Sequence, residues 1–173
     1  MSFILRVYYF LCALFWGEDT PSRSFRNLFA QIEKILIIIP LEEKLADSAV
    51  GPVHSLVETG KKVTVLIHHH SRSSFPNDYK IHFEEYYDSD LLFRKIPKFS
   101  FLKRLRGLPA DLVIDLDLTP DCFTSFCALP VKAPFKAGVS RKFFERSYSI
   151  RMQKNQGEQS TIPQNYVDLL FSL

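Results

Sequence analysis

The sequence predicts an α/β fold, a single Rossmann-like, doubly wound and mostly parallel sheet of about five or six strands, preceded by an apolar N-terminal helix. Residues 35–39 (ILIII) and 112–118 (LVIDLDL) are largely apolar runs, which are typical of parallel strands covered on both faces. Segments with helical spacing separate the strand-like runs. Right-handed crossovers then place helices on both faces of the sheet.

Strands are expected at six places along the chain, over residues 35–39, 62–67, 80–87, 112–118, 136–139 and 147–152. The third segment alternates polar and apolar residues, which indicates a strand near a sheet edge. If the strand order is 3-2-1-4-5-6, the first and fourth strands are neighbours. The loops that follow them then flank one crevice.

Helices are expected over residues 45–59, 91–108, 119–129 and 163–173. Pro52 indicates that the first of these begins near it or is kinked there, and Gly60 suits the residue just past its end. Pro97 interrupts the second, which is either one helix or two short ones. Thr119 followed by Pro120 is a favourable start for the third.

Two regions are expected, an apolar helix with its connector over residues 1–33 and the α/β domain over residues 34–173. Residues 2–16 are almost wholly apolar, with Arg6 as the one charge. A helix of this length is about 23 Å long, shorter than a hydrocarbon core of about 30 Å. Three interpretations stay open: a helix packed on the domain or on a partner, an interfacial membrane anchor, or an export signal.

Composition narrows the function classes. The chain has 46% hydrophobic and 24% charged residues, and its net charge of +3 is too small to indicate nucleic-acid binding. Cys12, Cys122 and Cys127 show no CxxC spacing, which argues against a disulfide framework or a zinc site and fits a reducing compartment. We expect a cytoplasmic protein, with membrane association as an open alternative.

Polar residues follow the first and fourth predicted strands, at the edge where ligands collect in open α/β sheets. The candidate residues are Glu42, Glu43, Asp47 and Ser48 on one side of the crevice and Asp117, Thr119 and Asp121 on the other.

Three adjacent histidines, residues 68–70, end the second predicted strand. On an extended strand His69 faces away from its neighbours, and Asp78 is the nearest acid. We therefore predict no metal site. The run is interpreted as a solvated strand end or, for His68, as a ligand contact at the sheet edge.

Basic and aromatic side chains alternate over residues 93–106. Such a pattern forms a solvated helix face with its aromatic residues in the core, or it lies on an anionic membrane or an acidic glycolipid. Together with the apolar N-terminal segment, it keeps an anionic membrane surface among the expected partners.

Residues 111–138 resemble part of the heptosyltransferase-like glycosyltransferases (glycosyltransferase family 9). The resemblance lies in the DLVIDL strand, the helix after it and a closing strand with Lys136-Ala137-Gly138 in place of an R-I-G type motif. Residues 34–67 are similar to the family's opening strand, Gly-Asp loop, Pro-containing helix and second strand. The resemblance covers about residues 34–152. It implies the N-terminal, acceptor-binding half of a two-domain (GT-B) transferase.

The resemblance gives Asp47 a role, because Ala46-Asp47 occupies the place of the family's Gly-Asp, whose Asp is the proposed catalytic base. A carboxylate at the carboxyl end of a strand suits that chemistry, although Asp also suits a helix cap. The chain departs from the family at Ala46, at Leu118, where a Gly is usual, and at Asp121, where a basic residue is frequent. No Gly-rich phosphate loop occurs, so we expect no cofactor and no self-sufficient transferase.

Three functions stay open on these grounds. The first is a ligand-binding or interaction module related to the acceptor half of a transferase. The second is the acceptor-binding subunit of a split or oligomeric glycosyltransferase that acts on a lipid-linked saccharide. In that case a homo-oligomer or a donor-domain partner chain supplies the nucleotide-sugar site. The third is an unrelated Rossmann-like domain.

Overall fold

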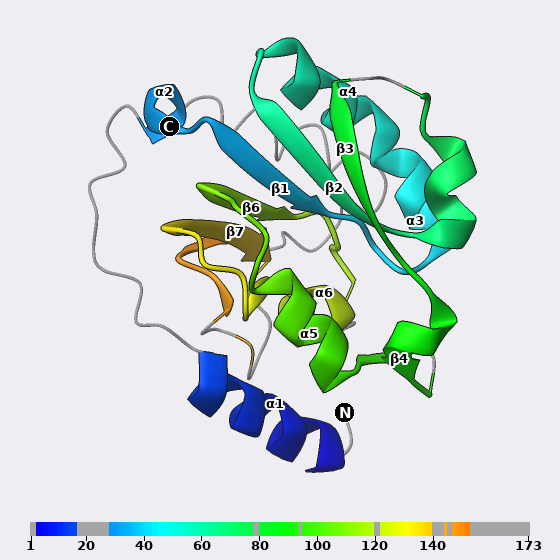
Figure 1. Ribbon diagram of the computed structural model, residues 1–173, viewed down its shortest axis with the longest axis vertical. Coiled ribbons are helices and arrows are strands. Elements are labelled where there is room, and N and C mark those ends of the chain that lie inside the picture. Colours follow the sequence, from blue (N-terminus) through cyan, green and yellow to red (C-terminus); the bar gives the residue numbers. More distant parts are fainter. Residues whose placement is uncertain are drawn as a thin grey trace.

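The computed structural model describes residues 3–16, 28–77, 80–93, 95–119, 122–139, 144 and 147–152. Its main sheet contains β1 (Lys34–Ile38), β2 (Lys62–His68), β3 (Ile81–Tyr86), β6 (Leu112–Asp115), β7 (Phe135–Val139) and β8 (Ile150–Met152). The strand order is β3-β2-β1-β6-β7-β8, and every pair is parallel. The predicted order and the edge position of the third strand are therefore confirmed (Figure 1).

β1 lies at the centre of the sheet, and its side chains alternate between two hydrophobic cores. Leu36 and Ile38 belong to one core, whereas Ile35, Ile37 and Ile39 belong to the other. All five side chains are at most 1% exposed. A strand covered on both faces gains no stability from polar residues on either side, which explains the unbroken apolar run.

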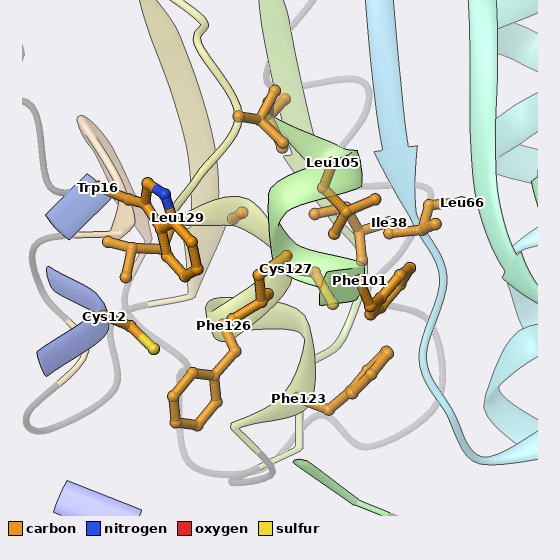
Figure 2. Packing of buried hydrophobic residues seen from close by; sticks show 14 of the residues in the cluster. Cys12, Trp16, Ile38, Leu66, Phe101, Leu105, Phe123, Phe126, Cys127 and Leu129 are labelled. Atoms are coloured by element: carbon orange, nitrogen blue, oxygen red, sulfur yellow. The ribbon is translucent and has the colours of Figure 1, made fainter. Parts of the chain in front are cut away.

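Helices cover both sheet faces, as a doubly wound fold requires (Figure 1). The helices are α1 (Phe3–Trp16), α2 (Leu28–Gln31), α3 (Glu43–Ser48), α4 (Val50–Glu58), α5 (Phe99–Leu105) and α6 (Phe123–Ala128). Buried residues of α4 pack in the core that contains Ile37, and those of α1, α5 and α6 pack in the core that contains Ile38. Figure 2 shows Phe101, Phe123 and Phe126 within the core that contains Ile38.

The N-terminal helix packs on the domain, in line with the first of the three interpretations. Tyr9 and Trp16 are buried, and their rings contact Phe126 of α6 and Phe99 of α5 at centroid distances of 5.4 and 4.5 Å. Among the described residues, no helix is both long and apolar enough to cross a bilayer.

Two local predictions differ from the structure. Residues 91–97 form a two-stranded antiparallel hairpin, β4 (Leu91–Leu92) and β5 (Ile96–Pro97), and only Phe99–Leu105 is helical. Pro97 explains this, because it disfavours helix in the residue before it. The helix expected from Thr119 begins instead at Phe123, with Cys122 as its N-cap.

Other helix boundaries were predicted correctly. The segment with Pro52 divides into α3 and α4, and α4 begins two residues before the proline, where the missing N–H costs little. Gly60 has φ +76° just past α4, the left-handed conformation that favours glycine. The helix predicted over residues 163–173 lies outside the described residues.

Candidate functional site

The carboxyl ends of β1 and β6 lie side by side, as the crevice prediction requires. Ile38 pairs with Asp115, and the backbone N of Leu116 donates a 3.1 Å hydrogen bond to the carbonyl of Ile38. The chain after β1 passes through Pro40 into α3, and the chain after β6 passes through Asp117 and Thr119 towards α6. The two acidic segments therefore leave the same edge of the sheet.

Asp47 lies in the last turn of α3 with its side chain exposed. It caps neither neighbouring helix, because Glu42 is the N-cap of α3, Ala49 is the N-cap of α4, and neither has a side-chain capping bond. Its carboxylate makes no hydrogen bond or ion pair within the described part of the chain. A negative charge near a helix C-terminus is also unfavourable for the helix dipole. The structure thus gives Asp47 no stabilising role.

Glu43 and Ser48, the other predicted site residues on α3, have local roles in the helix itself. Glu43 is exposed in the first turn of the helix, where an acidic side chain favours the helix dipole. Ser48 is exposed, and its hydroxyl donates a 2.6 Å hydrogen bond to the carbonyl of Leu45. Glu42 and Glu43 therefore begin the helix, and Ser48 ends it.

The loop after β6 is held by its own acidic residues. Asp117 is 2% exposed, and its Oδ1 accepts hydrogen bonds from the backbone N of Thr119 at 2.8 Å and from the Thr119 hydroxyl at 2.7 Å. These bonds close a turn of the kind that Asp side chains favour. Asp121 lies outside the described residues. The hydrogen bonds between Asp117 and Thr119 therefore stabilise the conformation of the loop itself.

A buried carboxyl group that was not among the predicted residues lies at the centre of this edge. Asp115 is 0% exposed and accepts hydrogen bonds from the backbone N of Asp117 at 2.8 Å, the Thr124 hydroxyl at 2.9 Å and the Tyr148 hydroxyl. Burial of the Cys127 thiol, followed by the negative charge of Asp115, raises the pKa of that thiol well above its usual range. The sequence signal was present, because an Asp inside a buried apolar strand requires polar partners.

The hydrogen bonds of Asp115 extend into a buried network that joins distant segments. The Tyr148 hydroxyl lies 3.0 Å from Oγ of Ser125, and the Ser147 hydroxyl donates to the carbonyl of Ser125 at 3.0 Å. Oγ of Ser147 also lies 2.9 Å from the Tyr9 hydroxyl of α1. The network therefore ties β6, α6, the segment before β8 and the N-terminal helix together.

The prediction of no metal site assumed that residues 68–70 are extended, with His69 facing away from its neighbours. The structure differs, because the strand does not continue past His68. β2 ends at His68, and the 3₁₀-helix η1 (His69–Ser74) begins at once. The turn brings the three imidazoles together, with ring centroids 4.7 Å apart for His68 and His69, 5.0 Å for His68 and His70, and 3.8 Å for His69 and His70. Burial, followed by the neighbouring His69, lowers the pKa of His68 although Asp88 opposes the shift.

A shallow cavity opens at the opposite, amino end of the strands. Its volume is about 390 Å³, and its lining includes Lys34, Lys62, Lys80 and His82. No sequence motif indicated it. Because it lies at the far edge of the sheet from Asp47, it is separate from the predicted crevice.

The fold and its carboxyl edge define a Rossmann-like α/β protein. No family model and no curated protein matches the sequence. Among solved structures, the chain is similar to the heptosyltransferase WaaC of E. coli, solved with ADP, with 11% identity and a TM-score of 0.54 over 79% of this chain and 46% of that one. It is also similar to a glycosyltransferase of family 9 from Veillonella parvula, with 13% identity and a TM-score of 0.55 over 81% of this chain and 40% of that one.

These similarities confirm, at the level of the fold, the family resemblance predicted from the sequence. The chain has a glycosyltransferase-like, heptosyltransferase-like fold. It spans less than half the length of either solved transferase.

Proposed function

We propose that this chain is a glycosyltransferase-like domain of the acceptor-binding kind. It binds a saccharide at the carboxyl edge of its sheet and acts as a ligand-binding or interaction module rather than as a self-sufficient transferase. Asp47 carries the proposal. Its carboxylate is exposed on α3, the helix that follows the carboxyl end of β1, and the fold has no stabilising use for it.

The chemistry of the edge supports a hydroxyl-rich ligand. A carboxylate oxygen accepts hydrogen bonds from sugar hydroxyls, and in a transferase it would remove the proton of the attacking hydroxyl. The loop of Asp117 and Thr119 on the other side is fixed by its internal hydrogen bonds. One side of the predicted crevice is thus preorganised, whereas Asp47 supplies a group that still needs a partner.

Saturation-transfer NMR with a panel of soluble oligosaccharides tests the proposal. We expect the native chain to show saccharide contacts that Asp47→Asn abolishes without a change in melting temperature. Glu58→Gln is the matched control, because Glu58 is an exposed acid at the far end of α4. Equal signals from all three proteins, or no signal from the native chain, would overturn it.

A second candidate function is favoured by one surface. Here the chain is the acceptor-binding subunit of a split or oligomeric transferase that works on a lipid-linked saccharide at a membrane. The large hydrophobic side chains exposed on α1, on the β4–β5 hairpin and at the start of α5 form what we call the apolar patch: Val7, Phe10, Leu11, Leu14, Phe15, Leu92, Phe93 and Phe99.

The parts of the apolar patch are joined by direct contacts. The Tyr8 hydroxyl of α1 donates a 2.9 Å hydrogen bond to the carbonyl of Pro97 in the hairpin, and the rings of Phe15 and Phe99 lie 6.4 Å apart. Phe93 at the hairpin tip is 90% exposed. Large exposed apolar patches are unusual on monomeric proteins and mark interaction surfaces.

Exposed lysines accompany the apolar patch and favour an anionic bilayer as its partner. Lys95 follows the hairpin tip, and Lys103 lies one helical turn after Phe99 on α5. Apolar side chains inserted among headgroups, together with lysines at the surface, give peripheral binding that depends on anionic lipid.

Co-sedimentation with vesicles tests the membrane function. We expect the native chain to pellet with phosphatidylcholine vesicles that contain phosphatidylserine, and less with phosphatidylcholine alone. Phe10→Ser with Leu14→Ser should abolish pelleting. Lys95→Glu with Lys103→Glu should weaken it more than the control pair Lys44→Glu with Lys62→Glu, which lies on other exposed surfaces. Native protein that stays in the supernatant would contradict the proposal.

A further inference from the structure

The histidine cluster at the end of β2 has more nitrogen ligands than the fold uses. Nε2 of His68 and Nδ1 of His69 are both buried, and neither has a hydrogen-bond partner among the described residues. A buried polar atom without a partner costs free energy, so two of them side by side require an explanation.

The geometry of the cluster fits a metal ion. One ligand nitrogen from each of His68, His69 and His70 lies within 4.8 Å of the other two. In a tetrahedral zinc site the nitrogens lie about 3.3 Å apart, because each is about 2.0 Å from the ion. Closing that difference needs a movement of about 1.5 Å at most. His70 is exposed, so rotation of its side chain can provide the movement.

A carboxylate from another part of the chain lies beside the first of these imidazoles. Oδ1 of Asp88 lies 3.3 Å from Nε2 of His68, within ion-pair distance. Asp88 begins the 3₁₀-helix η2 (Asp88–Asp90), which follows β3. Its side chain is 45% exposed whereas that of His68 is 7% exposed, so the cluster opens to solvent on the side of the acid.

Aromatic residues hold the imidazoles in place from behind. The His68 ring packs edge-on against Tyr86 at 5.1 Å, and the His69 ring stacks on Tyr87 at 4.7 Å. Nδ1 of His68 accepts a long hydrogen bond of 3.4 Å from the backbone N of His70. A ligand bound at Nε2 would move the ring proton to Nδ1, and this hydrogen bond would then be lost. Loss of so long a bond is a small cost beside a metal–nitrogen bond.

We propose that His68, His69, His70 and Asp88 bind a divalent first-row transition ion of the zinc type. Three imidazoles and a carboxylate suit such an ion, whereas calcium and magnesium prefer oxygen ligands alone. The ion links η1 to η2 and so fixes the connections that follow β2 and β3. This site does not depend on a saccharide or on Asp47.

Isothermal titration of the untagged full chain with zinc chloride, in a buffer that does not chelate metals, tests the site. We expect one ion per chain with micromolar or tighter affinity, and a higher melting temperature in excess zinc, because a ligand of the native state stabilises it. Cobalt substitution should give the visible spectrum of a site without thiolate ligands, which separates the cluster from the three buried cysteines.

The chain offers a matched control, since its five histidines include two outside the cluster. His69→Ala with His70→Ala should weaken zinc binding at least tenfold, and Asp88→Asn should weaken it by a smaller factor. His54→Ala with His82→Ala removes the same number of exposed or partly exposed imidazoles and should leave binding unchanged. If the double variant of the cluster misfolds, His70→Ala alone serves, because His70 is exposed.

Two outcomes would overturn the proposal. Native protein that binds no stoichiometric zinc would show that the imidazoles are only an aromatic stack. Equal binding by the cluster variant and the native chain, or loss of binding in the His54 and His82 control, would place any bound ion elsewhere.

Discussion

Two acidic residues at the same edge of the sheet have opposite environments. Asp115 ends β6, is 0% exposed and accepts hydrogen bonds from Asp117, Thr124 and Tyr148. Asp47 follows β1, is exposed and has no polar partner within the described residues. The comparison separates two uses of a carboxylate: one supports the sheet edge, and the other is available to a ligand.

Replacement of Asp115 should have the largest effect on stability. Asp115→Ala removes the acceptor of buried hydrogen bonds from Asp117, Thr124 and Tyr148, and we expect a loss of about 3–5 kcal/mol in the free energy of unfolding. Urea titration followed by tryptophan fluorescence measures this, because the single tryptophan, Trp16, is buried against the domain. A loss below about 1 kcal/mol would remove the distinction between the two acids.

Gly138 tests the same region from the next strand. A Cβ at this position would lie 2.6 Å from Cδ1 and Cζ of Tyr148, closer than real Cβ atoms approach other groups. Gly138→Ala should therefore displace the Tyr148 ring and its hydroxyl from Asp115, at a cost of about 2–3 kcal/mol. In a chain that already carries Tyr148→Ala, the ring that clashes is absent. Gly138→Ala should therefore cost less free energy of unfolding there than it does in the native chain. Purely additive losses would show that the ring is not the cause.

Thr124 isolates one of the three donors. Thr124→Val keeps the shape of a 0% exposed side chain but removes the hydroxyl that donates to Asp115, and we expect a loss of about 1–2 kcal/mol. A double-mutant cycle with Asp115→Ala measures the coupling directly. Coupling near zero would mean that the other two donors satisfy Asp115 without Thr124.

The sequence predicted the sheet well because its strands carry their own signals. ILIII and LVIDL are too apolar for any position other than the centre of a covered sheet, and parallel pairing then follows from the helical crossovers. The hairpin at residues 91–97 was missed because local spacing favoured a helix there. Its short strands are held by contacts made at a distance, such as the hydrogen bond from Tyr8 to Pro97.

The site was predicted in part, for a physical reason that differs from residue to residue. The positions of Asp47 and Asp117 after β1 and β6 could be predicted, because position after a strand is readable from the chain. The contact between Asp115 and Tyr148 was not predicted, because the two residues lie far apart in the sequence and are brought together by the pairing of β6, β7 and β8. The imidazoles of residues 68–70 come together because the backbone turns at His69, and no glycine or proline at this point predicts the turn.

Replacement of Asp47 should have the smallest effect on stability and is the sharpest test of the comparison. Asp47→Asn removes a charge from the last turn of α3, where it opposes the helix dipole, and deletes no interaction of the described chain. We expect the free energy of unfolding to change by less than about 0.5 kcal/mol, with any change towards greater stability. Glu43→Gln is the matched control, because it removes a favourable charge from the first turn of the same helix and should destabilise slightly. If Asp47→Asn instead costs more than about 1 kcal/mol, Asp47 supports the fold as Asp115 does, and its availability to a ligand no longer argues for a saccharide site.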